Sequence, residues 1–310
     1  MLSLESGMID KKVKVSIIIP HYNQKDCLQK LFPNLVDQTY KDFEVILIDD
    51  CTPDKATITF VRDFIKDKPN MHLVQNEVNM RFVKTVNRGI TLAKGEYICL
   101  LNSDTEVKNN FVQRNVEILD SDPGIGGVTC TIVDQHGKNW FSGGRYRNGL
   151  PTNLKDDFQG IRSADFIAGT AVFYRKVIFD RIGLFDENFI MYHEDIEFGI
   201  RVKHYTDYRL CTFSDKLVAH IQVPSIPESN VWYYDSRNLM LMAREYTPIN
   251  IPTVIVKIMF FGVCLNLIVA TKRVLLGKFS LSKSSVSFAF ASFRGAVEGI
   301  TAKQTTHSCR

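Results

Sequence analysis

Two short polar stretches carry side chains suited to chemistry, and the first of them follows an apolar run. Residues 97–101 read Tyr-Ile-Cys-Leu-Leu and lead into the polar turn Asn102-Ser103-Asp104; such a run predicts a buried strand. Residues two apart on an extended backbone lean the same way, so Asn102 and Asp104 could address one ligand. An aspartate there is a hard oxygen donor suited to Mg²⁺ or Mn²⁺ that also holds a diphosphate. The alternative is a polar cap on the strand end.

The second stretch is Tyr-His-Glu194-Asp195, which is predicted to open a helix that continues through Arg201. Carboxylates in the first turn of a helix are stabilised by the helix macrodipole. Capping alone would therefore account for Glu194 and Asp195.

A further acidic pair, Asp49-Asp50, directly follows the apolar run 43–48. Carboxylates in that position are suited to accepting hydrogen bonds from a nucleotide base or ribose. Thr52-Pro53 also fits the start of a helix, with Thr52 as the N-cap. Both interpretations can hold together, since Asp50 can bind a ligand while Thr52 caps the helix.

The elements that must position these residues alternate between strand and helix. Strands are predicted at 15–19, 43–48, 71–74 and 97–101, and helices at 24–38, at 57–66 and in a segment that ends near Gly89 or Gly95. Strand, helix and strand with short connections form a βαβ unit, which is right-handed and parallel by default. Open α/β sheets bind ligands at the carboxyl edge of their strands. The polar turns are predicted to lie at that edge.

The second half of the chain is less regular. A strand is predicted at 172–174 and a short helix at 176–182, and His220 closes a later apolar strand. A lone histidine on such a strand is more often a core group than a ligand. Residues 124–162 are Gly-rich and are predicted to be irregular, and long loops near an active edge are also where acceptors bind.

Charge is distributed unevenly along the 310 residues. The chain is 45% hydrophobic and 23% charged, which is typical of a folded protein with a sizeable core. Its formal net charge is +4; from Ile249 onward eight Lys or Arg and one acidic residue give +7, which leaves −3 for the rest. These basic residues lie among apolar stretches, a pattern that favours an anionic membrane surface over nucleic acid as the partner.

The cysteines and the N-terminus bear on the compartment. Seven cysteines are scattered without a Cys-x-x-Cys pair, which indicates reduced thiols in a cytosolic setting and argues against a zinc site. Residues 1–14 contain no apolar core of signal-peptide length. Secretion is therefore not expected.

Four motifs together resemble the inverting nucleotide-sugar glycosyltransferases of the GT-A fold, the glycosyltransferase family 2 enzymes, whose members include rhamnosyltransferases of bacterial surface polysaccharides. The motifs are Val-Ser-Ile-Ile-Ile-Pro-His-Tyr-Asn, Ile-Asp-Asp-Cys-Thr-Pro-Asp, Asn-Arg-Gly-Ile with Ala-Lys-Gly-Glu-Tyr, and Leu-Leu-Asn-Ser-Asp-Thr. They occur in the family order over roughly residues 13–240. The resemblance implies an α/β fold, a Rossmann-like three-layer α/β/α arrangement with a mainly parallel mixed sheet.

The resemblance also implies how the chain is divided. An N-terminal extension at 1–12 precedes the glycosyltransferase domain at 13–248. That domain comprises a nucleotide-binding half at 13–105 and an acceptor half at 106–248. A helical, hydrophobic and basic tail at 249–310 follows.

The resemblance assigns a set of substrate-binding residues. They are Pro20, Tyr22 and Asn23 in the nucleotide pocket, Asp50 at the pyrimidine base, Asn79 and Asn87 near the donor, Asn102 and Ser103 in the metal motif, and Arg237 at the donor phosphates. Asn102 stands where the family's D-x-D motif has its first aspartate, and an amide oxygen is a weaker, neutral ligand. Arg81 stands where relatives usually carry Gly, and whether it contacts phosphate or faces solvent is left open.

Opposite roles are implied for the two main acidic stretches. Asp104 matches the second aspartate of the metal motif and would anchor Mg²⁺ or Mn²⁺, and His220 matches the histidine that completes the site. Asp195, with Glu194 beside it, matches the Glu-Asp motif whose aspartate is the general base for the acceptor hydroxyl. For Arg237, which could grip phosphate as a bidentate donor, the alternative is a surface helix start. The Gln-x-x-Arg-Trp signature of processive synthases is absent, which favours transfer of one sugar per encounter.

The tail is predicted to associate with a membrane. Residues 251–270 are almost wholly apolar over about the length that crosses a bilayer, although Lys257 and Asn266 interrupt them, and a lysine at mid-membrane costs roughly 2.5–3.5 kcal/mol. Residues 279–297 place apolar side chains on one face of a basic helix, which suits a membrane interface. The alternative is an oligomer contact or a core helix pair.

The expected function is metal-dependent, inverting transfer of one sugar, rhamnose from dTDP-rhamnose, onto a lipid-linked or polysaccharide acceptor of O-antigen or capsule. The expected place is the cytoplasmic face of the cell membrane, with peripheral or C-terminal attachment. Expected partners are a dTDP or UDP sugar, a glycan or lipid-linked glycan and the membrane, without nucleic acid; a homo-oligomer is left open. The alternatives are another donor (UDP-glucose, UDP-galactose or UDP-GlcNAc) or a non-catalytic scaffold of the same fold. A sugar nucleotidyltransferase is disfavoured because the chain has no N-terminal Gly-rich phosphate loop.

Overall fold

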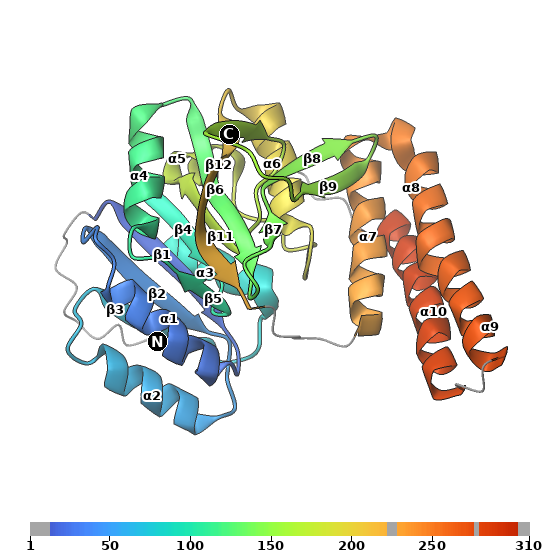
Figure 1. The fold of residues 1–310 in the computed structure, drawn as a ribbon, viewed down its shortest axis with the longest axis horizontal. Coiled ribbons are helices and arrows are strands. Elements are labelled where there is room, and N and C mark those ends of the chain that lie inside the picture. Colours follow the sequence, from blue (N-terminus) through green and yellow to red (C-terminus); the bar gives the residue numbers. More distant parts are fainter. Residues whose placement is uncertain (1–12, 222–227, 276–278, 303–310) are drawn as a thin grey trace.

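The computed structural model describes residues 13–221, 228–275 and 279–302. Figure 1 shows an α/β part, in which helices cover a central sheet, and a bundle of long helices beside it. The strands are β1 (Val15–His21), β2 (Phe43–Asp49), β3 (Met71–Gln75), β4 (Tyr97–Leu101), β5 (Thr105–Val107), β6 (Ile125–Asp134), β7 (Asn139–Phe141), β8 (Gly143–Arg147), β9 (Leu150–Leu154), β10 (Ile161–Ala164), β11 (Ala171–Arg175) and β12 (Arg209–His220). The helices are α1 (Lys25–Val36), α2 (Lys55–Ile65), α3 (Arg81–Leu92), α4 (Phe111–Ser121), α5 (Lys176–Ile182), α6 (Glu194–Tyr205), α7 (Glu228–Tyr246), α8 (Ile251–Lys257), α9 (Leu265–Leu275) and α10 (Phe279–Thr301).

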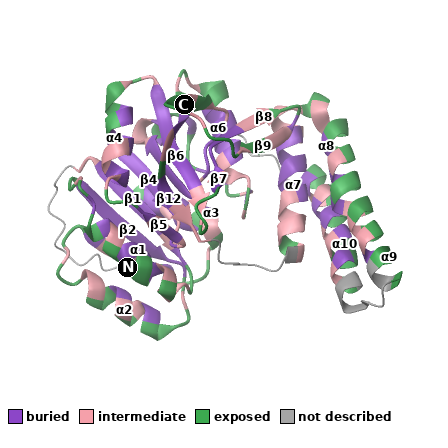
Figure 2. Cartoon of the chain, viewed as in Figure 1, coloured by how far each residue is buried: buried purple, intermediate pink, exposed green. Residues whose placement is uncertain are grey.

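The large sheet has the order β10-β12-β6-β11-β4-β1-β2-β3. Strands β1, β2, β3 and β4 are parallel to one another, whereas β11 runs antiparallel between β4 and β6. The four strands predicted in the first half are confirmed to within two residues at each end. Strands β1, β2 and β4 are rich in β-branched and aliphatic side chains because both of their faces are covered (Figure 2), whereas the edge strand β3 is mostly half-buried.

Side chains of the sheet alternate between two apolar layers. Ile17 and Ile19 of β1 pack into one buried cluster with Leu28 and Phe32 of α1, while Ile18 joins a second cluster on the opposite face, with α3 and α5. The α/β/α arrangement expected from the sequence is therefore confirmed. Register within the sheet places His21 opposite Asp49, so the carboxyl ends of β1 and β2 lie at one edge.

The prediction that residues 124–162 are irregular was wrong. Most of this segment is strand, and β6 is buried at the centre of the sheet. Its glycines serve close packing: a Cβ on Gly126 would lie 2.5 Å from the Cβ of Tyr208, and a Cβ on Gly127 would lie 2.6 Å from the Tyr174 ring. Glycine in a strand often marks a site where a neighbour approaches closely, so the Gly-rich composition was misread as a loop signal.

The C-terminal helices pack around α7. A Cβ on Gly295 of α10 would lie 2.2 Å from the carbonyl oxygen of Tyr233, and one on Gly299 would lie 2.3 Å from that of Arg237. A side chain at either position would collide with the backbone of α7. Glycine at 295 and 299 therefore lets α10 pack directly against α7. The boundary predicted at 248 stays a prediction; in Figure 1, α7 lies with α8 and α10.

Residues 248–272 form a long helical run that includes a π-helical segment, Ile258–Cys264. By length and composition this run could cross a membrane, and 22% of its most apolar window is buried. Exposed apolar side chains also follow one face of α10, at Val286, Phe290, Phe293 and Val297. The amphipathic face predicted for the tail is therefore exposed.

Candidate active site

A cavity of about 210 Å³ lies at the carboxyl edge of the sheet. Its lining includes seven of the predicted site residues: Pro20, Tyr22, Asp50, Asn79, Asn102, Ser103 and Asp104. It also includes His21, Gln24, Arg81, Phe82, Thr85 and Met191. Arg81 was named from the sequence, with its role left open between phosphate contact and exposure to solvent. The other five were not named as site residues. The motif Pro-His-Tyr-Asn contains His21, which was the available signal for that residue.

Asp50 organises the start of α3. Its carboxylate accepts hydrogen bonds from the backbone N–H groups of Met80 (2.7 Å) and Arg81 (2.9 Å) and from the Asn76 amide (2.8 Å). The predicted Thr52 cap is not what begins α2, because the side chain of Asp54 accepts from the first free N–H groups of that helix. A carboxylate has about four acceptor positions, so Asp50 retains capacity for a ligand in the cavity.

Tyr22 and Asn23 follow β1 in a tight turn. The backbone N–H of Asn23 donates to Thr52 Oγ1 (2.9 Å), and Asn23 adopts a positive φ of 55°. The Tyr22 ring is 48% exposed beside the cavity. An open aromatic face next to a polar cavity is suited to stacking on a nucleotide base.

The two asparagines near α3 differ in their surroundings. Asn79 lines the cavity, and its side-chain oxygen accepts from the Arg81 N–H (3.2 Å). Asn87 is buried and exchanges hydrogen bonds with both backbone groups of Phe185 (2.9 and 3.1 Å). It ties α3 to the segment after α5 and is not among the cavity-lining residues.

Asp104 and His220 meet where β5 pairs with β12. Asp104 Oδ2 lies 3.3 Å from His220 Nε2, and the rings of Trp140 and His220 pack in a T-shaped arrangement with centroids 4.6 Å apart. In the part of the chain that the structure describes, His220 Nδ1 and Asn102 Oδ1 are buried without a hydrogen-bond partner. Orphaned buried polar atoms are costly. Their presence here is consistent with a site that a ligand completes.

These residues fit a divalent cation only if other groups, such as substrate phosphates, supply the remaining ligands. Within residues 13–221, 228–275 and 279–302, no group of three or more His, Cys, Asp or Glu is arranged to hold a metal. Asp104 and His220 supply one oxygen and one nitrogen, and Asn102 adds an amide oxygen nearby in the chain. Mg²⁺ is commonly bound through one or two carboxylates together with substrate phosphates, so this donor set suits a cation that arrives with a diphosphate.

Asp195 is connected to the metal motif through two adjacent residues. Asp195 Oδ2 accepts from the backbone N–H of Gly169 (3.0 Å), and the carbonyl of Thr170 accepts from the backbone N–H of Asn102 (2.8 Å). Residue 171 then begins β11, paired with Leu101 at the end of β4. The segment before β11 therefore brings Asp195 to the same sheet edge as Asp104.

The acidic pair at the start of α6 is partly buried. Burial raises the pKa of Asp195, while the Gly169 N–H and then His193 act in the opposite direction. Burial, and after it the charge of Asp195, raises the pKa of Glu194. Among the described residues, Glu194 Oε2 has no hydrogen-bond partner. A carboxylate with a raised pKa is a stronger base than one in water.

Arg237 lies away from the cavity lining. It is buried, and its guanidinium donates to the carbonyl of Asn188 (2.8 Å), to Asn238 Oδ1 (2.9 Å) and to Glu298 of α10 (3.3 Å). These partners hold α7 against α10 and against the segment before α6. The structure does not bring Arg237 together with the other predicted donor-binding residues.

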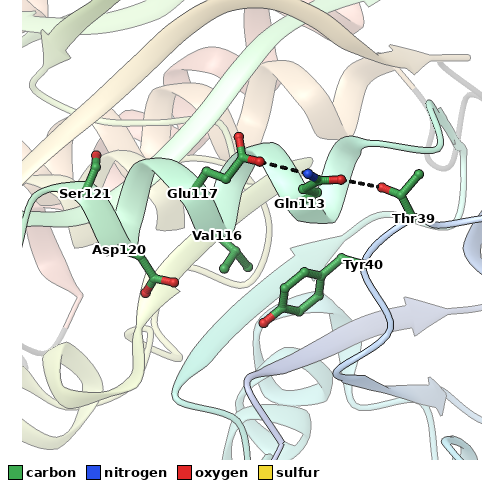
Figure 3. Close-up of a pocket in the computed structure, with 7 residues that line it drawn as sticks. All are labelled: Thr39, Tyr40, Gln113, Val116, Glu117, Asp120 and Ser121. Carbon is green, nitrogen blue, oxygen red and sulfur yellow. Dashed lines mark hydrogen bonds between the residues drawn. The ribbon is translucent and has the colours of Figure 1, made fainter.

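A second depression lies between α4 and the segment before β2. Figure 3 shows its lining, which includes Tyr40, Gln113 and Asp120. Tyr97, at the amino end of β4, donates to Asp120, so this depression is at the opposite sheet edge from Asp104. None of its residues was predicted from the sequence to do chemistry.

Comparison with known proteins agrees with this geometry. The amylovoran biosynthesis glycosyltransferase AmsB of Erwinia amylovora is 27% identical over 211 residues, which are 67% of this chain and 65% of that relative. The chain thus spans slightly less than two thirds of the relative's length.

Two solved structures share the fold. TarS 1-349 of S. aureus aligns with a TM-score of 0.60 and 17% identity over 93% of this chain and 90% of that one. The mannosyltransferase PcManGT of Pyrobaculum calidifontis, solved with GDP-Man and Mn²⁺, aligns with a TM-score of 0.57 and 15% identity over 95% and 89%. Likeness at this level of identity concerns the fold, and it confirms the GT-A fold expected from the motifs.

The family model described as "Glycosyl transferase family 2" matches residues 16–183, which is 168 of 310 residues and more than half of the chain. That match includes β1 to β4, the Asn102-Ser103-Asp104 turn and the Gly169–Thr170 segment. Because this match covers more than half of the chain, the chain belongs to glycosyl transferase family 2.

Proposed function

We propose that the protein is a metal-dependent, inverting glycosyltransferase that moves one sugar from a nucleotide-diphosphate donor to a hydroxyl of a surface-polysaccharide acceptor. The observation that carries the proposal is the link from Asn102 through Thr170 and Gly169 to Asp195, because it brings a base and the Asp104 motif to one sheet edge. An inverting transfer needs a base and a leaving-group site on opposite sides of one sugar.

Asp104 and His220, with Asn102, would hold Mg²⁺ or Mn²⁺ together with oxygens of the donor diphosphate. When bound, the cation supplies positive charge against the departing diphosphate. PcManGT, which shares the fold, was solved with Mn²⁺, and the unpartnered oxygen of Asn102 supports the same type of site here.

Asp195 would act as the general base. Its two oxygens already accept N–H groups of Gly169 (3.0 Å) and Ile196 (2.8 Å), which fix the carboxylate in one orientation. As the acceptor oxygen forms its bond to the anomeric carbon, its proton passes to Asp195. The bond from that carbon to the diphosphate oxygen breaks, and its electron pair leaves with the nucleotide diphosphate. Glu194 lies beside the base and, through its raised pKa, retains a proton more readily than a solvated glutamate.

The nucleotide would occupy the cavity beside Tyr22, Asp50 and Asn79. For the sugar we propose rhamnose delivered as dTDP-rhamnose, because Asn102 stands at the first position of the metal motif, as in the rhamnosyltransferase-like branch. The alternatives are UDP-glucose, UDP-galactose and UDP-GlcNAc. The role of AmsB in amylovoran biosynthesis supports a polysaccharide or lipid-linked glycan acceptor.

The helical tail would place the enzyme on the cytoplasmic face of the cell membrane. Apolar side chains are exposed along 248–272 and along one face of α10, and a lipid interface would cover both. Such attachment would bring the sheet edge close to a lipid-linked acceptor.

A donor panel tests the proposal. Purified protein is given dTDP-rhamnose, UDP-glucose, UDP-galactose and UDP-GlcNAc with and without Mn²⁺, and released nucleotide is measured together with transfer to a lipid-linked acceptor. Asp195→Asn should lower transfer about 10³-fold or more while donor binding is retained, since removal of a general base typically costs 10²–10⁴-fold. Unchanged glycan extension in cells that carry Asp195→Asn would favour the non-catalytic scaffold.

A further inference from the structure

The turn that delivers the proposed base to the sheet edge has an uncommon backbone. Residues 188–193 connect the segment after α5 to α6, and both Tyr192 (φ 66°) and His193 (φ 67°) are in the left-handed region. Side chains with a Cβ disfavour this region, so two successive residues persist there only when their surroundings hold them. Met191 of this turn lines the cavity, and Asp195 follows within α6.

Asn238 of α7 holds the backbone on either side of this conformation. Its amide nitrogen donates to the carbonyls of both Met191 (2.9 Å) and Tyr192 (2.7 Å), and the side chain is fully buried. Its oxygen accepts from Arg237, whose guanidinium also donates to the carbonyl of Asn188 (2.8 Å). Both polar atoms of the Asn238 side chain are thus hydrogen-bonded: the nitrogen to the turn itself and the oxygen to Arg237, which also bonds to the turn.

A second α7 residue holds the last position of the turn. Asp235 Oδ1 lies 3.2 Å from His193 Nε2. Burial raises the pKa of Asp235, but the hydrogen bond with His193 and the charge of that residue lower it further, so the pKa lies below its ordinary value. Asp235 and Asn238 are three apart, so they lie on one face of α7. That face contacts the turn, and the neighbouring face packs on α10.

We infer that Asn238 is a positioning residue for the transfer reaction, acting through the 188–193 turn to set the place of Asp195 and Met191. The inference rests on the proposed function, in which Asp195 is the base. Met191 is the residue of this turn that lines the cavity with Tyr22, Asp50 and Asn79. Asp50 and Asn79 are themselves held by the backbone N–H groups of Met80 and Arg81, so Asn238 supports neither of them directly.

The test is the isosteric change Asn238→Asp, which replaces the amide donor by an acceptor facing two carbonyls. Transfer should fall about 10²-fold in kcat, the loss expected for a misplacement of about 1 Å at a reacting group. Affinity for dTDP or UDP with Mn²⁺ should fall much less than kcat, because Asp50 and Asn79 keep their own hydrogen bonds and only Met191 links the turn to the nucleotide cavity. Hydrogen exchange should speed up at the amides of residues 189–196 and stay unchanged in β1 and β4.

Two further variants keep the inference falsifiable. Asp235→Asn, at a partly exposed side chain, should change the same exchange rates in the same direction with a smaller loss of kcat. Met242→Leu, one turn further along the buried face of α7, is the matched control and should leave both measurements at the wild-type level. Asn238→Asp with wild-type kcat, or with faster exchange spread over the whole chain, would overturn the inference.

Failure of the proposed function gives a different pattern. If wild-type protein transfers no sugar from any donor while Asn238→Asp still loosens residues 189–196 alone, the turn is braced by α7 but the assigned base is wrong. If exchange in that segment does not change, the bracing itself is refuted whatever the activity.

Discussion

Asp104 Oδ2 and His220 Nε2 face each other at 3.3 Å across the β5–β12 pair, although 116 residues separate them in the chain. Ile221 strengthens this junction, because its backbone N–H donates to the Asp104 carbonyl at 2.9 Å. The two candidate metal ligands are therefore held by backbone pairing rather than by their own side chains.

Asp104 and His220 should contribute to metal-dependent activity to different degrees. Asp104→Asn removes the charged oxygen and should lower Mn²⁺-dependent kcat/KM about 10³-fold, since a carboxylate is the preferred ligand of such cations. His220→Gln should raise the Mn²⁺ concentration for half-maximal activity about tenfold, within the range for loss of a supporting group. Titration of donor turnover with Mn²⁺ and Mg²⁺ measures both effects. Identical metal curves for wild type and His220→Gln would remove the histidine from the site.

Activity should rise with pH through the raised pKa of Asp195. A general base works only when deprotonated, and burial moves that deprotonation to higher pH than for an ordinary aspartate. The acidic limb of the kcat/KM profile should therefore lie at higher pH than the pKa of an ordinary aspartate. Initial rates from pH 4 to 9 test this. A limb at the ordinary aspartate pKa would mean that Asp195 is solvated during catalysis.

The same two carboxylates should reduce stability at neutral pH. A folded-state pKa above the unfolded value means that the folded protein binds protons more tightly, so their contribution to stability is present below the unfolded pKa and is lost as the pH rises through the folded one. Glu194→Gln should then raise Tm by about 1–2 °C at pH 7.5, the shift for roughly 1 kcal/mol in a chain of 310 residues. At pH 4 the gain should disappear. A lower Tm at both pH values would contradict the assignment.

A buried ionic group joins α6 to the end of α7. Arg201 is fully buried, pairs with Glu197 at 2.7 Å and donates to the carbonyls of Ile182 and Leu184, and the Tyr246 hydroxyl donates to Glu197 at 2.5 Å. Arg201→Ala should cost about 3–5 kcal/mol, because it leaves a buried carboxylate without its cation. Tyr246→Phe should cost only about 1.5–3 kcal/mol. Urea denaturation gives both values, and a smaller loss for Arg201→Ala than for Tyr246→Phe would contradict the ranking.

The exposed apolar face of α10 should bind lipid. Replacing Phe290 and Phe293, which are 68% and 53% exposed, by Ser should weaken sedimentation with phosphatidylglycerol vesicles about tenfold or more, because burying one phenylalanine side chain contributes about 1.5–3 kcal/mol. The matched control replaces both by Leu and should retain binding. Unchanged sedimentation together with a smaller particle in light scattering would show that this face instead joins copies of the chain.

The sequence predicted the edge of the sheet better than the surroundings of the base. Strands β1 to β4 could be read because a buried parallel strand needs a continuous apolar run, and the polar residues that follow them line the cavity. Strand β6 was missed because its glycines make room for Tyr174 and Tyr208, and that close approach is invisible in the chain itself. Local pattern therefore predicted which residues line the cavity at this sheet edge.

Arg237 shows the limit of local pattern. Its partners Asn188 and Glu298 are 49 and 61 residues away, and only the packing of α7 against α10 brings them together. An arginine beside aromatic residues in a family motif favoured phosphate binding, whereas the folded chain uses it to join two helices and a turn. The hydrogen bonds of Asn87 to Phe185, which is 98 residues away, were likewise beyond local pattern, and its expected place near the donor stays a prediction.

Antiparallel β11 reverses the usual relation between a strand and its loop. Because it runs against β4 and β6, the segment that enters it, rather than one that leaves it, faces the reactive edge, and Gly169 and Thr170 belong to that entrance. Under the proposed function, a loop exchanged at this entrance would change which acceptor reaches Asp195 while β1 to β4 keep their register. New glycan linkages would then arise without a change in the cavity proposed for the nucleotide.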